Sequence, residues 1–147
     1  MLVGDYIHNL DIKGRIFMPS KFRDDMSDGF VATKGMERTM AIYSRKEWER
    51  IEAAVRKLPT AEARNFRLVM SSGAAELEID KQGRFVIPQK LREYANLEGD
   101  VAFIGLSDHI EIWTKERWDE YNKENEKKKE EKPVDMVAEV MATLVVE

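Results

Sequence analysis

Short runs in which apolar and polar residues alternate predict that much of the chain is β-strand. In residues 5–10, Tyr6, His8 and Leu10 fall on one face of an extended chain, and Ile7 falls on the other. Similar short runs, bounded by glycine, proline or polar turns, recur along the chain. They predict further strands at 16–18, 30–33, 40–43, 74–79, 84–87, 101–105 and 110–113. The pattern therefore predicts a fold that is mainly β.

Other stretches carry apolar residues at helical spacing. Ser44 and Glu47 fit a capping box, which predicts a helix with Trp48 and Val55 on its apolar face and its end at Pro59. Further helical segments are expected near 20–26, 60–73, 91–94 and 114–121. We therefore expect an α+β protein.

The end of the chain differs in composition from the rest. Residues 123–132 are almost all charged and predict a solvated helix or a flexible link, and Pro133 predicts a break. Residues 134–146 are apolar at helical spacing, with Val140 and Leu144 on one face. An exposed apolar face needs a partner, and the pattern leaves open whether that partner is the same domain or a neighbouring subunit.

A five-residue motif, Asp-x-x-Gly-Arg, occurs twice, at 11–15 and at 80–84. Each copy is followed by an apolar run and a proline, and the copies are 69 residues apart (80 − 11). The same spacing relates Arg23 to Arg92. Two copies predict a paired, pseudo-symmetric protein whose halves share one core, and not a solenoid. We expect a first repeat with its helix at 1–58, a connecting helix at 59–72, a second repeat with its helix at 73–122, and a charged linker with an apolar C-terminal helix at 123–147.

The chain has 147 residues, no cysteine and a formal net charge of −4. Its length suits one compact domain, and the lack of cysteine excludes disulfides and thiolate metal sites. Residues 12–23 and 81–92 each hold four basic residues and no acidic one. Residues 1–58 carry 11 basic and 9 acidic side chains, whereas residues 73–122 carry 6 and 11. We therefore expect the first copy to dominate any contact with a polyanion.

The sequence gives little support to other chemistry. His8 and His109 are the only histidines, and without ligand spacing they predict no metal site. Gly-rich phosphate loops and Ser-based nucleophile elbows are absent, so we expect no catalytic residue, no cofactor and no small-molecule substrate. The N-terminus lacks the pattern of a signal peptide, and no apolar stretch approaches the ~18 residues of a membrane span. We therefore expect a cytoplasmic protein with no membrane partner.

The repeated motif has two interpretations. In the structural one, the aspartate accepts hydrogen bonds from turn amides and pairs with the arginine. In the functional one, the aspartate holds the loop while arginine and lysine project toward a phosphate backbone or a base edge. Duplication in register, inside two acid-free basic segments, gives the functional interpretation as much weight as the structural one.

The repeat resembles the AbrB-like (SpoVT-AbrB) swapped-hairpin DNA-binding domain. The combination of both copies resembles the MraZ family, bacterial regulators of the division and cell-wall gene cluster. The resemblance rests on Gly4–Asp11, Lys13-Gly14-Arg15, Pro19, Lys21-Phe22-Arg23, Gly73–Glu76, Asp80–Arg84, Ile87-Pro88, Leu91-Arg92 and Ile110–Trp113. It covers roughly residues 1–122.

The resemblance implies a mainly β fold with helices, in which two repeats build a pseudo-two-fold, double-psi-like barrel. It further implies an octamer-like homo-oligomeric ring, associated with the nucleoid, that binds short direct repeats in promoter double-stranded DNA and represses transcription. We expect DNA contacts from the basic residues Lys13, Arg15, Lys21, Arg23, Lys81 and Arg84. We expect the turn itself to depend on Asp11, Gly14, Asp80 and Gly83.

Two alternatives remain open at this stage. The first is a protein-assembly scaffold whose basic turns are only structural. The second is an enzyme on the same barrel type, such as the self-processing decarboxylases, which cut their chain at a Gly-Ser bond. This sequence has no Gly-Ser dipeptide, which disfavours the enzyme.

Overall fold

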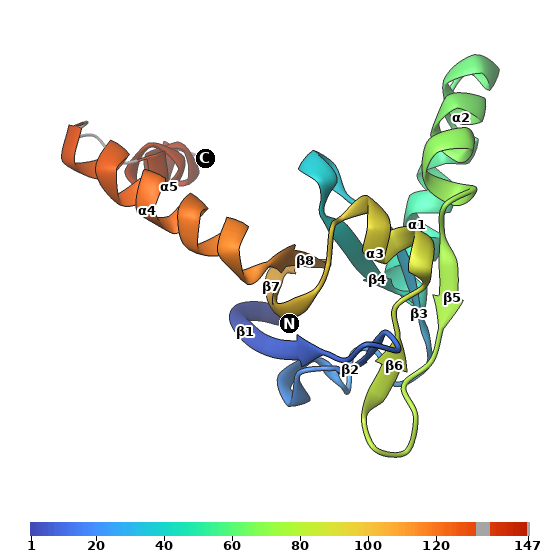
Figure 1. The fold of residues 1–147 in the computed structure, drawn as a ribbon. Coiled ribbons are helices and arrows are strands. Elements are labelled where there is room, and N and C mark those ends of the chain that lie inside the picture. The colour runs from blue at the N-terminus through green and yellow to red at the C-terminus, as the bar shows by residue number, and fades with distance from the viewer. Residues whose placement is uncertain (132–135, 147) are drawn as a thin grey trace. The chain divides into compact units, whose positions relative to one another are not determined.

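The computed structural model describes residues 1–131 and 136–146, and contains eight strands and five α-helices in those ranges (Figure 1). The strands are β1 (Leu2–Leu10), β2 (Arg15–Phe17), β3 (Phe30–Lys34), β4 (Met40–Ser44), β5 (Ala75–Leu77), β6 (Arg84–Val86), β7 (Gly99–Ser107) and β8 (Ile110–Thr114). The helices are α1 (Arg45–Arg56), α2 (Thr60–Phe66), α3 (Gln89–Tyr94), α4 (Lys115–Glu131) and α5 (Met136–Val146). The mixed α+β class expected from the sequence is therefore confirmed.

The strands form a six-stranded antiparallel sheet in the order β1-β7-β8-β4-β3-β5 and a separate two-stranded ribbon, β2-β6. The repeat spacing makes β1 to β4 the counterparts of β5 to β8. Exchanging counterparts reverses the sheet order onto itself, so the strand order has the pseudo-two-fold symmetry that the repeat implies. The swapped-hairpin, double-psi-like barrel stays a prediction.

Every strand of the first repeat is hydrogen-bonded to a strand of the second. The pairs are β1 with β7, β2 with β6, β3 with β5, and β4 with β8. The turn at 11–15 consequently joins two strands that pair with other strands, and β1 and β2 form no ladder with each other. The two repeats are interleaved through their backbone hydrogen bonds.

One apolar core joins the two repeats, as the sequence suggests. Ile16, Met18 and Phe22 of the first repeat are buried together with their second-repeat counterparts Phe85, Ile87 and Leu91. Phe85 makes edge-to-face contacts with Phe30 at 5.1 Å and Phe103 at 6.3 Å between ring centroids. Burial of these side chains fixes the ribbon against the sheet.

The predicted helix signals are mostly confirmed. The Ser44 hydroxyl accepts a 3.2 Å hydrogen bond from the Glu47 amide, and Trp48 and Val55 of α1 are buried. The helix α2 begins at Thr60, and Pro59 is its N-cap residue. A π-helical turn, Arg67–Ser71, follows α2.

Residues from Glu116 onward form a second compact unit, separate from Met1–Lys115. Its described part contains most of α4, which includes the charged stretch up to residue 131, and α5. Val137, Val140, Met141 and Leu144 of α5 are exposed. The break expected at Pro133 lies outside the described residues. In the described ranges, no helix is both long and apolar enough to cross a membrane.

Candidate nucleic-acid interface

The first turn is held together by the carboxylate of Asp11. Its Oδ1 accepts hydrogen bonds from the amides of Lys13 and Arg15, both at 2.9 Å, and its Oδ2 accepts one from Arg15 Nε at 2.7 Å. The Asp11 carbonyl also accepts from the Gly14 amide at 3.0 Å. Gly14 has φ +86°, a conformation that glycine adopts at little cost. One aspartate thus fixes both the backbone of the turn and the direction of its arginine.

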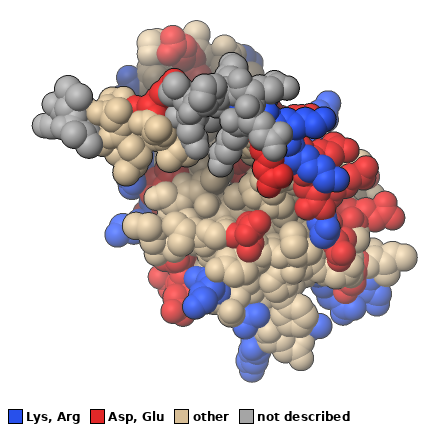
Figure 2. All heavy atoms as spheres, turned by 90° about the vertical axis from the view of Figure 1, so that its left-hand side faces the viewer, with Lys and Arg blue, Asp and Glu red and all other residues tan. Residues whose placement is uncertain are grey.

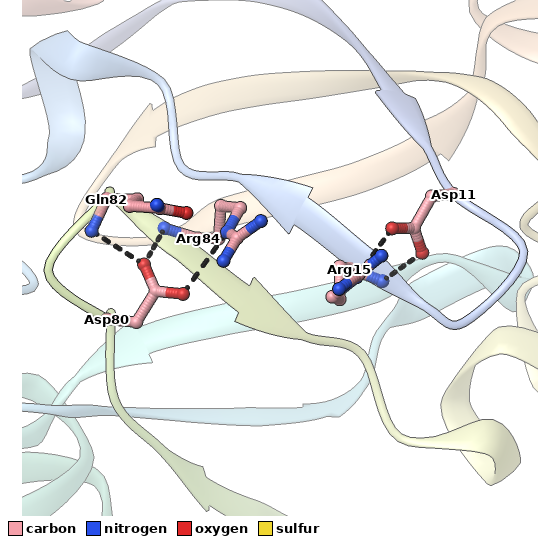
Figure 3. Close-up of polar contacts among 5 residues, drawn as sticks. All are labelled: Asp11, Arg15, Asp80, Gln82 and Arg84. Atoms are coloured by element: carbon pink, nitrogen blue, oxygen red, sulfur yellow. Dashed lines mark hydrogen bonds and ion pairs between the residues drawn. The ribbon is translucent and has the colours of Figure 1, made fainter.

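The second turn repeats this arrangement (Figure 3). Asp80 Oδ1 accepts from the amides of Gln82 and Arg84, both at 2.9 Å, and Oδ2 accepts from Arg84 Nε at 3.2 Å. Gly83 has φ +87°, and its amide donates to the Asp80 carbonyl at 3.0 Å. The structural interpretation of the repeated motif is therefore correct in detail for both copies, and it leaves the functional one open.

These hydrogen bonds favour the ionised carboxylates. The backbone amide of Arg15 is the main reason that the pKa of Asp11 is lowered, and its guanidinium lowers that pKa further. The amide of Arg84 is likewise the first cause of the lowered pKa of Asp80. Both carboxylates therefore stay charged, and hold their arginines, well below neutral pH.

The two turns lie at opposite ends of the β2–β6 ribbon (Figure 3). In its register, Arg15 is opposite Val86 and Phe17 is opposite Arg84. The alternate residues of the ribbon, Ile16 and Phe85, are buried. Side chains alternate between faces, so both arginines share the outward face with two apolar neighbours. Phe17 is 44% exposed and Val86 50% exposed.

The two turn arginines are both oriented and accessible. The Arg15 side chain is 45% exposed and that of Arg84 is 32% exposed. Of the side-chain nitrogens of each arginine, only Nε donates a hydrogen bond within the described part of the chain. The terminal Nη1 and Nη2 atoms donate to no protein group there. The carboxylates leave these nitrogens available for an external acceptor.

The other predicted basic residues fall into two groups. Lys13, Lys21 and Lys81 are exposed. Arg23 is half-buried, and its Nε donates a 2.9 Å hydrogen bond to the Met18 carbonyl. Arg23 is thus bound to the backbone, whereas the lysines extend into solvent.

Sequence reasoning missed two features of this region. Arg92, in α3, is the counterpart of Arg23, and its Nε donates to the Ile87 carbonyl at 3.0 Å. The 69-residue spacing already pointed to Arg92. Phe17 and Val86 on the outward face could have been found from the alternation in the apolar runs that follow each motif.

Charges on the side of the molecule shown in Figure 2 are mixed. Lysine and arginine side chains in this view lie close to acidic ones, and they form no continuous basic surface among the residues it shows. A formal net charge of −4 agrees with this picture. On this face, any attraction for a polyanion would have to come from local groups of basic residues.

His109 lies in a separate polar cluster at the β7–β8 connection. Its Nδ1 is 2.6 Å from Asp108 Oδ1 and its Nε2 is 3.6 Å from Glu111 Oε2. The interaction with the Glu111 carboxylate is the main reason that the pKa of His109 is raised. No group of three or more histidine, cysteine, aspartate or glutamate side chains suited to a metal occurs among the described residues.

One known protein family matches each of the two repeats of this chain. The family model described as "MraZ protein, putative antitoxin-like" matches residues 1–68 and again residues 70–139. The protein named "Transcriptional regulator MraZ" from Thermoanaerobacter pseudethanolicus is 50% identical over 124 residues, which are 83% of this chain and 87% of that protein. The protein of the same name from Acetivibrio thermocellus is 44% identical over 146 residues, 98% of this chain and 99% of that protein. The protein of the same name from Clostridium tetani is 46% identical over 127 residues, which are 85% of this chain and 89% of that protein.

A mixed α+β fold built from two interleaved repeats, together with these similarities, places the chain in a class of transcriptional regulators and not of enzymes. The chain belongs to the MraZ family. The resemblance inferred from the duplicated motif is thereby confirmed.

Proposed function

We propose that this protein binds promoter double-stranded DNA through the outward face of the β2–β6 ribbon and represses transcription. The observation that carries this proposal is the pair of solvent-accessible turn arginines, Arg15 exposed and Arg84 half-buried, each fixed at Nε by an aspartate of its own turn. A guanidinium that is already oriented loses little conformational freedom when it binds a guanine edge or a phosphate. Lys13, Lys81 and Lys21 add exposed positive charge for the phosphates.

The size of the ribbon suits a DNA groove. The major groove is about 12 Å wide and admits a two-stranded β-ribbon. Arg15 and Arg84 are diagonal neighbours on the ladder, a relationship that places backbones about 7–8 Å apart. This separation is roughly two base-pair steps of about 3.4 Å each. This spacing would allow both arginines of one subunit to contact base pairs about two steps apart in the same groove.

A single ribbon neutralises few phosphates, so we propose that affinity comes from an octamer-like ring of subunits. Tethered subunits raise each other's effective concentration at DNA. Subunits around a ring follow one another head to tail, in contrast to the facing subunits of a two-fold dimer. Such an arrangement reads direct repeats, which is the operator type we propose, in the promoter of a bacterial division and cell-wall gene cluster. The protein would then act in the cytoplasm, at the nucleoid.

The Arg15→Ala variant tests the proposal. Removing this guanidinium leaves the buried side of the ribbon, Ile16 and Phe85, unchanged, so the variant is expected to fold and assemble like the wild type. Titration of DNA from upstream of the protein's own gene should show a loss of affinity of about 1–3 kcal/mol, roughly fivefold or more, as expected for a guanine contact. Affinity equal to that of the wild type would overturn the proposal and favour the scaffold alternative.

A further inference from the structure

We infer that each DNA-contacting turn is held in shape by an arginine from the opposite repeat, so that Arg92 positions the Asp11–Arg15 turn and Arg23 positions the Asp80–Arg84 turn. Both are positioning residues that act through the turns. The inference deepens the proposed function and rests on it only for the DNA measurements.

Arg92 lies directly against the first turn. A Cβ atom built on Gly14 would be 2.9 Å from Arg92 Cζ and 3.0 Å from its Nε. The Nε of Arg92 donates to the Ile87 carbonyl at 3.0 Å, and the Ile87 amide donates to the Gly14 carbonyl at 2.8 Å. The guanidinium thus covers the glycine of one repeat while it is anchored to the strand end of the other.

Arg23 makes the same arrangement with the second turn. A Cβ atom built on Gly83 would be 2.6 Å from Arg23 Cζ. The Nε of Arg23 donates to the Met18 carbonyl at 2.9 Å, and the Met18 amide donates to the Gly83 carbonyl at 2.9 Å. The two copies match atom for atom, which would be unexpected for two incidental surface contacts.

The glycines therefore serve two purposes. Each has a positive φ, which the turn requires, and each leaves the space that the arginine occupies. Arginine suits this position because its Nε donates one directed hydrogen bond while its planar head covers the glycine. A lysine ammonium in the same place lacks that planar head.

Hydrogen exchange measured by mass spectrometry on the full-length protein tests the inference at the level of structure. Peptides covering residues 11–15 and 80–84 report the two turns, whose amides are hydrogen-bonded to Asp11 and Asp80. In Arg92→Ala, exchange at 11–15 is expected to rise about tenfold while 80–84 is unchanged. In Arg23→Ala the pattern should be reversed, and each variant is the matched control of the other.

The crossed pattern is what distinguishes positioning from general support. If each arginine changes the turn of its own repeat, or both turns equally, or neither, the inference is wrong. Arg92→Lys, which retains the charge, is the second variant in case the alanine variant fails to fold. It should show the same crossed pattern with a smaller increase, and wild-type exchange in it would also contradict the inference.

DNA binding separates this inference from the proposed function. Because Arg92 acts through the first turn, adding Arg92→Ala to Arg15→Ala should cost little further affinity, whereas adding it to Arg84→Ala should multiply the two losses. A crossed exchange pattern with unchanged DNA affinity in Arg15→Ala would retain the inference and remove the proposed function. Lost DNA affinity in Arg15→Ala without the crossed exchange pattern would retain the proposed function and remove the inference.

Discussion

Arg15 and Arg84 lie diagonally across the β2–β6 ladder, Arg15 opposite Val86 and Arg84 opposite Phe17. Two residues that are 69 positions apart in sequence therefore form one outward-facing group. Each is fixed by an aspartate four residues before it, Asp11 or Asp80.

Lys21→Ala and Arg15→Ala should weaken DNA binding in different ways. Lys21 is exposed and is proposed to contact only phosphates, so its loss should lower affinity equally for operator and unrelated DNA and reduce the salt slope by about one unit. The Arg15 variant should lose about 1–3 kcal/mol on operator DNA and less on unrelated DNA. Fluorescence anisotropy with both duplexes at several salt concentrations measures this, and identical losses on both duplexes for Arg15→Ala would exclude base contact.

Gly14→Ala should be more destabilising than Gly99→Ala. Both glycines have positive φ, +86° and +65°, but a Cβ at Gly14 would be 2.9 Å from Arg92 Cζ, whereas a Cβ at Gly99 meets nothing within 4 Å. Backbone strain alone costs about 1–2 kcal/mol in each. Denaturant unfolding should show a further loss of at least about 1 kcal/mol for Gly14→Ala. Equal losses would mean that Arg92 moves aside without cost.

The two turns should remain intact until the pH falls below 3.8, the ordinary pKa of their aspartates. Asp11 and Asp80 have lowered pKa values in the folded protein because the amides of Arg15 and Arg84 donate to them. A lowered pKa contributes stability above the unfolded-state value, and this contribution is lost as the pH falls through the folded-state value. NMR titration of the carboxyl carbons should place both midpoints below 3.8, and midpoints at or above 3.8 would contradict the turn geometry.

His109 should stabilise the fold most in mildly acidic solution. Its pKa is raised above 6.5, first by Glu111, and the pKa of Glu111 is lowered below 4.5, first by its interaction with His109. The contribution of His109 to folding stability is complete below pH 6.5 and is lost as the pH rises through the folded-state pKa of the histidine. The contribution of Glu111 is complete above pH 4.5 and is lost as the pH falls through the folded-state pKa of the glutamate. The pair therefore contributes most between about pH 4.5 and 6.5.

Urea unfolding of His109→Gln and the wild type at pH 5.5 and pH 8 checks this prediction. The stability difference between the two proteins should be larger at pH 5.5. His8→Gln is the control, because burial and then Arg23 lower the pKa of His8 and give the opposite trend. A difference for His109→Gln that is larger at pH 8 would contradict the assignment.

The sequence predicted the local features of this structure more fully than the long-range ones. The Asp-x-x-Gly-Arg turns and the Ser44 cap depend on residues within five positions of each other, so composition and spacing identify them. The pairing of His8 with Val101 joins residues 93 positions apart (101 − 8), and no local pattern selects that partner. The sequence therefore did not predict which strand of one repeat pairs with which strand of the other.

The orientation of the arginine side chains also could not be predicted from the sequence. Arg15 and Arg23 lie in the same acid-free segment, and their side chains are identical. Only the fold shows that Arg23 donates to a backbone carbonyl and covers Gly83, while Arg15 keeps its terminal nitrogens accessible. Arg92 lies against Gly14 just as Arg23 lies against Gly83. This symmetry is the best support for assigning Arg23 a positioning role and Arg15 a DNA-contacting role.

The most direct measurement is a salt titration of binding to DNA from the protein's own promoter, comparing the wild type with the Arg15→Ala, Arg84→Ala double variant. Between about 50 mM and 200 mM salt the wild type should lose affinity steeply, because it releases counterions from the phosphates that it neutralises. The double variant should bind far more weakly at the lower salt concentration while keeping its secondary structure and subunit number. A folded double variant that binds as tightly as the wild type would show that the ribbon is not the DNA-binding surface.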